Sequence, residues 1–217
     1  MAESKFHTDL KTTKKETVAM ALFAREMLRS AVDAMIRQDK ELAATVVAKK
    51  DTLHTMEVKL EEHCYQLIAT GQPMAKDMRV IACTLKVINA SLRIGRYGKV
   101  IANIVKDISE KPHISHMMSI PHMADLAMDM IDDSIKAYET DSIALIGDFS
   151  ARDDTIDALR HSIFREGITH MMEDPKTISR CTHYIMVARY LERCADHACK
   201  IAENVHYMNT GERIEIH

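Results

Sequence analysis

The sequence predicts an all-α protein made of two tandem three-helix bundles, with six long antiparallel helices. Three observations support this prediction. The 217 residues include only 6 Gly and 4 Pro, and neither type occurs before Gly71. Aromatic residues make up only 5% of the chain, which is rich instead in Ala, Leu, Ile, Lys and Glu, and these residues favour helices over strands. The second half of the chain also repeats the pattern of the first.

The few helix breakers divide the first half into three expected helices. Apolar residues at helical spacing predict a helix over residues 17–36, and a second follows over 42–69 after a polar turn. Gly71 suits the C-cap of this second helix, and Pro73 suits the first turn of the next. A third helix is expected over 74–108.

The second half is expected to repeat this plan after a linker. Two of the four prolines fall within residues 111–121, and this clustering indicates a connection between domains. Three further helices are expected over 122–138, 141–172 and 175–208. The predicted organisation is a first bundle over residues 1–110, the linker over 111–121 and a second bundle over 122–217.

Two pairs of segments carry the internal repeat. DTLHTM, from Asp51, aligns with DTIDAL, from Asp154. LRIG, from Leu92, aligns with ERCA, from Glu192. A repeat of about 100 residues is too long for a solenoid unit and suits a duplicated up-down-up bundle.

Charge and hydropathy exclude several classes of function. A net charge of −3 and a pI near 6.5 provide no basic field for nucleic acid. The uncharged apolar runs are far shorter than the roughly 20 residues that a membrane-spanning helix needs. The first ten residues lack the apolar core of a signal peptide. We therefore expect a cytoplasmic protein that neither spans a membrane nor binds nucleic acid.

The cysteines and the missing catalytic motifs indicate a reduced protein that is not an enzyme. The odd number of cysteines and the absence of a CxxC pair favour reduced, buried thiols over a disulfide framework. These residues are Cys64, Cys83, Cys181, Cys194 and Cys199. No nucleophile motif, phosphate-cradling glycine loop or nucleotide motif occurs in the sequence.

Two pairs of carboxylates are the candidate metal ligands. Asp153 and Asp157 lie four residues apart on the expected fifth helix, and so share one face. Glu192 and Asp196 have the same spacing on the sixth helix. Counted from Asp174 in the turn, Asp157 lies 17 residues back and Glu192 lies 18 residues forward, so the pairs reach the same height in an antiparallel hairpin. Four converging carboxylates require protons or cations, and their oxygens suit iron, manganese, magnesium or calcium, with zinc also acceptable.

Other interpretations of these acids stay open. Acids spaced by four residues are common on solvated helix faces, where Arg152 or Arg193 could pair with them. His161 follows Asp157 by one turn and His197 adjoins Asp196, so either histidine could support a metal or simply face solvent.

Two further patterns have simple alternatives. A ferritin-type di-iron oxidase needs two ExxH motifs on helices of one bundle. Here one motif, from Glu110, straddles Pro112, and the other, from Glu203, has no second such helix beside it. Methionines near the linker and fourth helix indicate either core packing or an adaptable binding surface. They are Met117, Met118, Met123, Met128 and Met130.

The C-terminal stretch resembles a known family. ARYLERCADHACKIAENVHYMNTGE, over residues 188–212, is similar to the C-terminal LERxxDHAxNIAE run of the PhoU family of phosphate-signalling regulators. The resemblance extends to residues 153–178 and 72–79 and covers nearly the whole chain from about Met20 onward. It implies two three-helix bundles whose E/DxxxD motifs hold metal clusters, of iron or zinc in known cases.

Carried over position by position, the resemblance implies metal ligands at Glu192 and Asp196, with Asp153 and Asp157 facing them. The first half departs from the family pattern. Where the family has a second acidic motif, this chain has Leu92 and Arg96, and opposite them it has Lys50 and His54. A cation cannot replace a carboxylate ligand, so one metal cluster is expected, in the C-terminal bundle.

The resemblance also implies a function. Members regulate phosphate uptake through the ATPase subunit of a phosphate ABC importer and, in bacteria, a membrane sensor kinase, and they are often dimers. We therefore expect a non-enzymatic regulator, a homodimer that associates with the membrane at most peripherally. Two alternatives remain: a carboxylate-bridged metalloprotein with redox or hydrolytic activity, and a metal-free helical scaffold.

Overall fold

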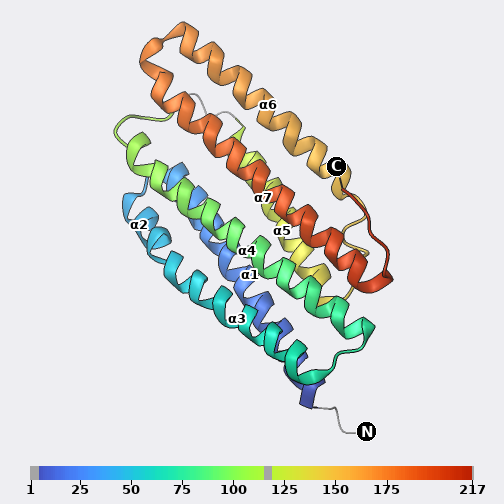
Figure 1. The fold of residues 1–217 in the computed structure, drawn as a ribbon. Helices are drawn as coiled ribbons and strands as arrows, with labels where there is room; N and C mark the ends of the chain where they lie inside the picture. The colour runs from blue at the N-terminus through green and yellow to red at the C-terminus, as the bar shows by residue number, and fades with distance from the viewer. Residues whose placement is uncertain (1–4, 115–118, 217) are drawn as a thin grey trace.

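The computed structural model describes residues 5–114 and 119–216, which contain helices and no strand (Figure 1). The α-helices are α1 (Lys5–Arg37), α2 (Lys40–Ala48), α3 (Lys50–Gly71), α4 (Ala75–Ile108), α5 (Ile120–Thr140), α6 (Phe149–Glu173) and α7 (Ile178–Thr210). Helices α1 to α4 pack together as one bundle, and α5 to α7 pack together as a second. The predicted all-α class with two tandem bundles is confirmed.

The range in which one second helix is predicted holds two helices. The break falls at Lys49, whose N–H donates to the Val46 carbonyl at 3.2 Å and closes a tight turn. Helix α2 begins after Asp39, because its carboxylate accepts hydrogen bonds from the N–H groups of Glu41 and Leu42 at 3.0 and 2.9 Å. Together α2 and α3 form one broken rod along the edge of the first bundle.

Two helices end at residues in the left-handed backbone conformation that the sequence does not single out as helix ends. Gln72, with φ of 47°, is the C-cap of α3, while Gly71 is the last helical residue. Asp141, with φ of 54°, ends α5, a conformation that Asp adopts more readily than most residues. The helix predicted from residue 141 therefore begins only at Phe149. Residue Pro175 starts a 3-10 turn, η2 (Pro175–Thr177), before α7.

Helix α4 is packed on two opposite sides. Towards α1, a methyl group on Gly98 would lie 2.9 Å from the Leu28 nitrogen and 3.0 Å from the Met27 carbonyl carbon, so the two backbones approach closely. Towards α7, the ring of Tyr97 stacks on Tyr190 with centroids 5.7 Å apart. One continuous hydrophobic core therefore passes through both bundles.

Polar contacts also join the bundles through α1 and α5. Arg25 makes a bidentate pair with Asp132, at 2.9 Å from Nε to Oδ1 and 2.6 Å from Nη2 to Oδ2. Arg29, one turn after Arg25 on α1, donates to Asp125 at 2.9 Å. Because bidentate pairs fix direction as well as distance, these contacts set the register of α5 along α1.

The described part of the predicted linker is bonded to both bundles. His113 lies 2.8 Å from the Tyr184 hydroxyl and 3.2 Å from the Ile36 carbonyl. Arg180 donates to the Pro112 carbonyl at 2.5 Å. Residues 115–118 of that linker, including Met117 and Met118, lie outside the described residues. Since the core is continuous, the domain boundaries after residue 110 and before residue 122 stay a prediction.

The remaining sulfur residues support a packed interior. All five cysteines are buried and unpaired, as predicted, and burial raises the pKa of the Cys64 thiol to about 11. Met123, Met128 and Met130 are fully buried, so these three pack in the core. Within the described ranges, no helix combines the length and apolar character required to span a membrane.

Gly98→Ala is expected to lower the free energy of unfolding by about 1–3 kcal/mol, the usual effect of overfilling a packed core. The added methyl would meet backbone atoms of α1, which cannot move alone. Urea denaturation measures the change. Gly95→Ala is the control, because its methyl would meet mainly the flexible Cδ2 atom of Leu53. Equal losses in both variants would contradict the backbone constraint.

Candidate functional site

The predicted metal ligands lie on α6 and α7. They are Asp153, Asp157, Glu192 and Asp196. Arg160 connects the two helices, because its Nε atom lies 4.0 Å from Asp157 Oδ1 and 3.9 Å from Glu192 Oε1. Asp153 lies two turns before Arg160 on α6, and its Oδ1 atom accepts a hydrogen bond from the thiol of Cys199 on α7 at 3.7 Å. These two contacts each reach a residue three positions from the one that counting from the turn pairs with Glu192 or Asp153, so the convergence of the four carboxylates stays a prediction.

The four carboxylates act on one another electrostatically. Burial raises the pKa of Asp153, and the negative charges of Asp196 and Asp157 raise it further. Burial likewise raises the pKa of Glu192, with Asp196 as the next largest cause. Each pair thus feels the charge of the other across the hairpin, and we refer to the four residues as the acidic quartet.

Two arginines neutralise the acidic quartet in part. Arg193 donates to Asp196 at 2.8 Å, and its Nε atom lies 3.5 Å from Glu192 Oε2. Even so, Glu192 Oε2 and Arg160 Nε are buried without a hydrogen-bond partner. The sequence predicts the role of Arg193 but misses that of Arg160, although Arg160 follows Asp157 by three residues and so shares its face.

The other arginine considered at the quartet lies elsewhere. Arg152 donates to Asp133 at 2.7 Å and lies 3.7 Å from Asp148. The sequence also does not predict the contact of Cys199 with Asp153, although Cys199 follows Asp196 by three residues on the same face of α7.

The chemistry of the acidic quartet fits a metal ion. Carboxylate oxygens from two helices suit hard and borderline cations, and one buried oxygen of Glu192 lacks a hydrogen bond. In residues 5–114 and 119–216, however, no three His, Cys, Asp or Glu side chains are grouped so as to hold a metal ion. The oxygens of Glu192 and Asp196 face arginines instead, so a metal would compete with Arg160 and Arg193. The quartet as a set of metal ligands stays a prediction.

The two histidines near the quartet differ in environment. His161 is exposed, with Nε2 3.2 Å from Nη2 of Arg160. His197 packs towards Tyr97 of α4, with ring centroids 6.0 Å apart. Burial lowers the pKa of His197 to about 4, so it is neutral at pH 7. His161 is therefore the more exposed of the two, while His197 is half-buried.

The two ExxH motifs are engaged in other contacts. His113 is bonded to the Tyr184 hydroxyl, as described above, and Glu110 is exposed. Glu203 accepts a hydrogen bond from the N–H of Ile216 at 3.0 Å, which holds the C-terminal segment back against α7. These contacts give both motifs a structural role.

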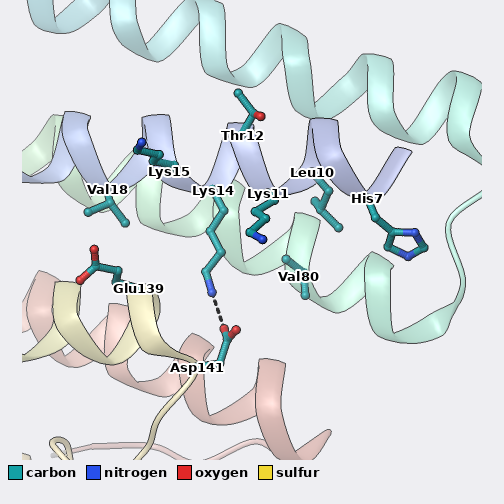
Figure 2. Close-up of a pocket in the computed structure, with 10 residues that line it drawn as sticks. All are labelled: His7, Leu10, Lys11, Thr12, Lys14, Lys15, Val18, Val80, Glu139 and Asp141. Carbon is teal, nitrogen blue, oxygen red and sulfur yellow. Dashed lines mark hydrogen bonds and ion pairs between the residues drawn. The ribbon is translucent and has the colours of Figure 1, made fainter. Parts of the chain in front are cut away.

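A second concave surface is lined by none of the quartet residues, and Figure 2 shows its lining. It is an open groove of about 650 Å³ between the start of α1, the start of α4 and the end of α5. Lys14 crosses it and donates to Asp141 at 2.5 Å. The Lys14 side chain is only 15% exposed, and its contact with Asp141 joins α1 of the first bundle to the end of α5 in the second.

Asp153→Asn is expected to raise the melting temperature of the metal-free protein at pH 7. Because folding raises the pKa of Asp153, the folded state binds the proton more tightly, and stability falls as the pH rises through the folded pKa. The gain should vanish near pH 4, where the unfolded carboxyl also titrates. Thermal unfolding in EDTA measures it, with Asp107→Asn, at an exposed position of α4, as control. A loss of stability at both pH values would contradict the repulsion.

Comparison with known proteins shows the family of this chain. The PhoU domain matches residues 17–105 and 120–205. The phosphate-specific transport system accessory protein PhoU homolog of Caulobacter vibrioides is 36% identical over 92% of this chain and 87% of the relative. The Aquifex aeolicus homolog is 33% identical over 97% and 96%. The crystal structure of PhoU from Pseudomonas aeruginosa superposes with a TM-score of 0.92 at 30% identity, covering 96% of this chain and 100% of that one. The chain therefore belongs to the PhoU domain family.

Proposed function

We propose that this protein is a non-enzymatic regulator of phosphate uptake and phosphate-starvation signalling that acts by binding other proteins. The similarity to accessory proteins of phosphate-specific transport, over 92% or more of this chain in the two relatives above, carries the proposal. Its principal partner is the ATPase subunit of a phosphate ABC importer, and a membrane sensor kinase is a second. The protein works in the cytoplasm as a homodimer, at the inner surface of the transporter.

The outer face of α6 supports a protein-binding role. In Figure 1, α6 lies at the edge of the molecule, where it packs on α7 and α5. Phe164, Ile168 and Met172 are 47%, 39% and 80% exposed, and their spacing of four residues puts them on one helix face. A row of exposed apolar side chains on an outer helix is typical of a protein interface.

The acidic quartet supports a structural role for a metal. An iron or zinc cluster, held by Asp153, Asp157, Glu192 and Asp196, would neutralise the mutual repulsion of the carboxylates and cross-link α6 to α7. Magnesium or manganese would satisfy the same oxygen ligands. Because α6 packs mainly on α7, such a cross-link would hold its outer face in a fixed position for the partner.

Glu192→Ala combined with Asp196→Ala is expected to abolish metal binding, since it removes both ligands on α7. Elemental analysis of the untagged protein measures metal content, with about one cluster per chain in the parent. Asp107→Ala with Glu110→Ala removes the same charge from exposed sites and should leave the metal content unchanged. Equal metal content in the parent and the quartet variant, or none in either, would refute the site.

Phe164→Asp with Ile168→Asp is expected to weaken binding to the importer ATPase subunit at least tenfold, because central apolar residues of an interface often contribute about 2 kcal/mol or more. Co-purification with the tagged ATPase subunit, followed by titration calorimetry, measures the loss. Ala158→Asp with Thr169→Asp adds the same charge at exposed positions of α6 and serves as control. Unchanged binding in the first variant would exclude this face, and a parent protein that binds no importer component would refute the proposed partner.

A further inference from the structure

We propose that the first bundle contains a binding site for a phosphate group, at the position that corresponds to the acidic quartet of the second bundle. The site is a cavity of about 160 Å³ between α1, α3 and α4. Four basic or titratable side chains line it, and we call them the basic cluster. They are Lys50, His54, Arg96 and Lys99.

The internal repeat puts the basic cluster in register with the quartet. Lys50 precedes DTLHTM as Asp153 precedes DTIDAL, so Lys50 corresponds to Asp153. By the same alignment, His54 corresponds to Asp157, and on the other helix Arg96 corresponds to Asp196. The two halves therefore place groups of opposite charge at equivalent points.

The burial pattern supports this register. Leu53 and its counterpart Ile156 are each 1% exposed, so α3 and α6 turn the same face inward. Lys99 also lines the cavity and lies at the position of Cys199. The position that contacts the quartet in the second bundle thus carries another cation in the first.

The charge of the basic cluster is not cancelled within the described part of the chain. Arg96 and Lys99 form no ion pair with any described residue. Lys50 lies 3.9 Å from Asp51, but that carboxylate is 91% exposed, and such surface pairs contribute little. Glu57 accepts a hydrogen bond from His54 Nδ1 at 2.8 Å and orients that ring. Two permanent cations, Arg96 and Lys99, therefore lie at the cavity without an internal partner, and Lys50 adds a third that has only this weak surface pair.

The size and lining of the cavity favour one phosphate group. Its volume equals that of roughly five water molecules in the liquid, at about 30 Å³ each, and is below the range of about 300–1,000 Å³ for drug-sized ligands. Met27, Leu53 and Leu92 form an apolar floor, which lowers the local dielectric and strengthens attraction to an anion. A guanidinium can bind two phosphate oxygens at once, and lysines add point charges. The phosphate group could be free or carried by a lipid headgroup.

Titration calorimetry of the full-length protein with inorganic phosphate, at constant ionic strength, tests the site. We expect saturable binding of one phosphate per chain. Arg96→Gln with Lys99→Gln should weaken it at least tenfold. Lys86→Gln with Lys106→Gln removes two exposed charges from the same helix and should bind phosphate as the parent does. Circular dichroism confirms that both variants are folded.

A second arm distinguishes the source of the phosphate group. Vesicles of phosphatidylcholine, with and without phosphatidic acid, are sedimented with the same three proteins. If the parent protein sediments with vesicles that contain phosphatidic acid, and only the Arg96 and Lys99 variant does not, the site binds the phosphate of a lipid headgroup. This result supports the site whether or not free phosphate binds. Failure of both probes, equal losses in both variants, or equal affinity for acetate and phosphate would overturn the proposal.

Discussion

The close approach of α4 to α1 is the constraint on which the rest of the molecule depends. Gly98 allows the two backbones to meet, and a side chain there would push α4 away from α1. The adjacent residue, Tyr97, points to the other bundle and stacks on Tyr190. A shift of α4 would therefore disturb both bundles at once. This helix belongs to one bundle and packs on the second, so the duplicated halves share a single core. We therefore expect the two bundles to unfold cooperatively and not as independent domains.

The duplication gives the chain two equivalent surface positions, one in each bundle. The second bundle carries acidic side chains there, and the first carries basic ones. In the second bundle, burial and mutual repulsion raise the pKa of Asp153 and Glu192. In the first bundle, the same points carry Arg96 and Lys99 beside a small cavity. At both positions an apolar residue faces the core, Leu53 in one half and Ile156 in the other, each 1% exposed. Packing and ligand chemistry have thus changed independently.

The regulation we propose fits the way α6 is held. This helix lies at the edge of the second bundle, and its apolar outer face is open to a partner. Arg160 spans from α6 to the carboxylate of Glu192, with its Nε buried and without a hydrogen bond. A cation at the quartet and the arginines would compete for the same oxygens. Metal occupancy would therefore alter the contacts between α6 and α7, behind the face that meets the partner.

The sequence alone determined most of the helix order, the unpaired cysteines and the placement of the two acid pairs on neighbouring helices, α6 and α7. These features follow from local properties: sparse breakers, cysteine spacing and the rise per residue of a helix. The break at Lys49, the left-handed turn at Asp141 and the burial of His197 were decided by the tertiary structure. So were the pairing of Arg160 with Glu192 and the cavity beside Arg96. Each of these depends on which helix lies opposite, because a side chain's partners, solvation and charge environment come from elements that are distant in the sequence.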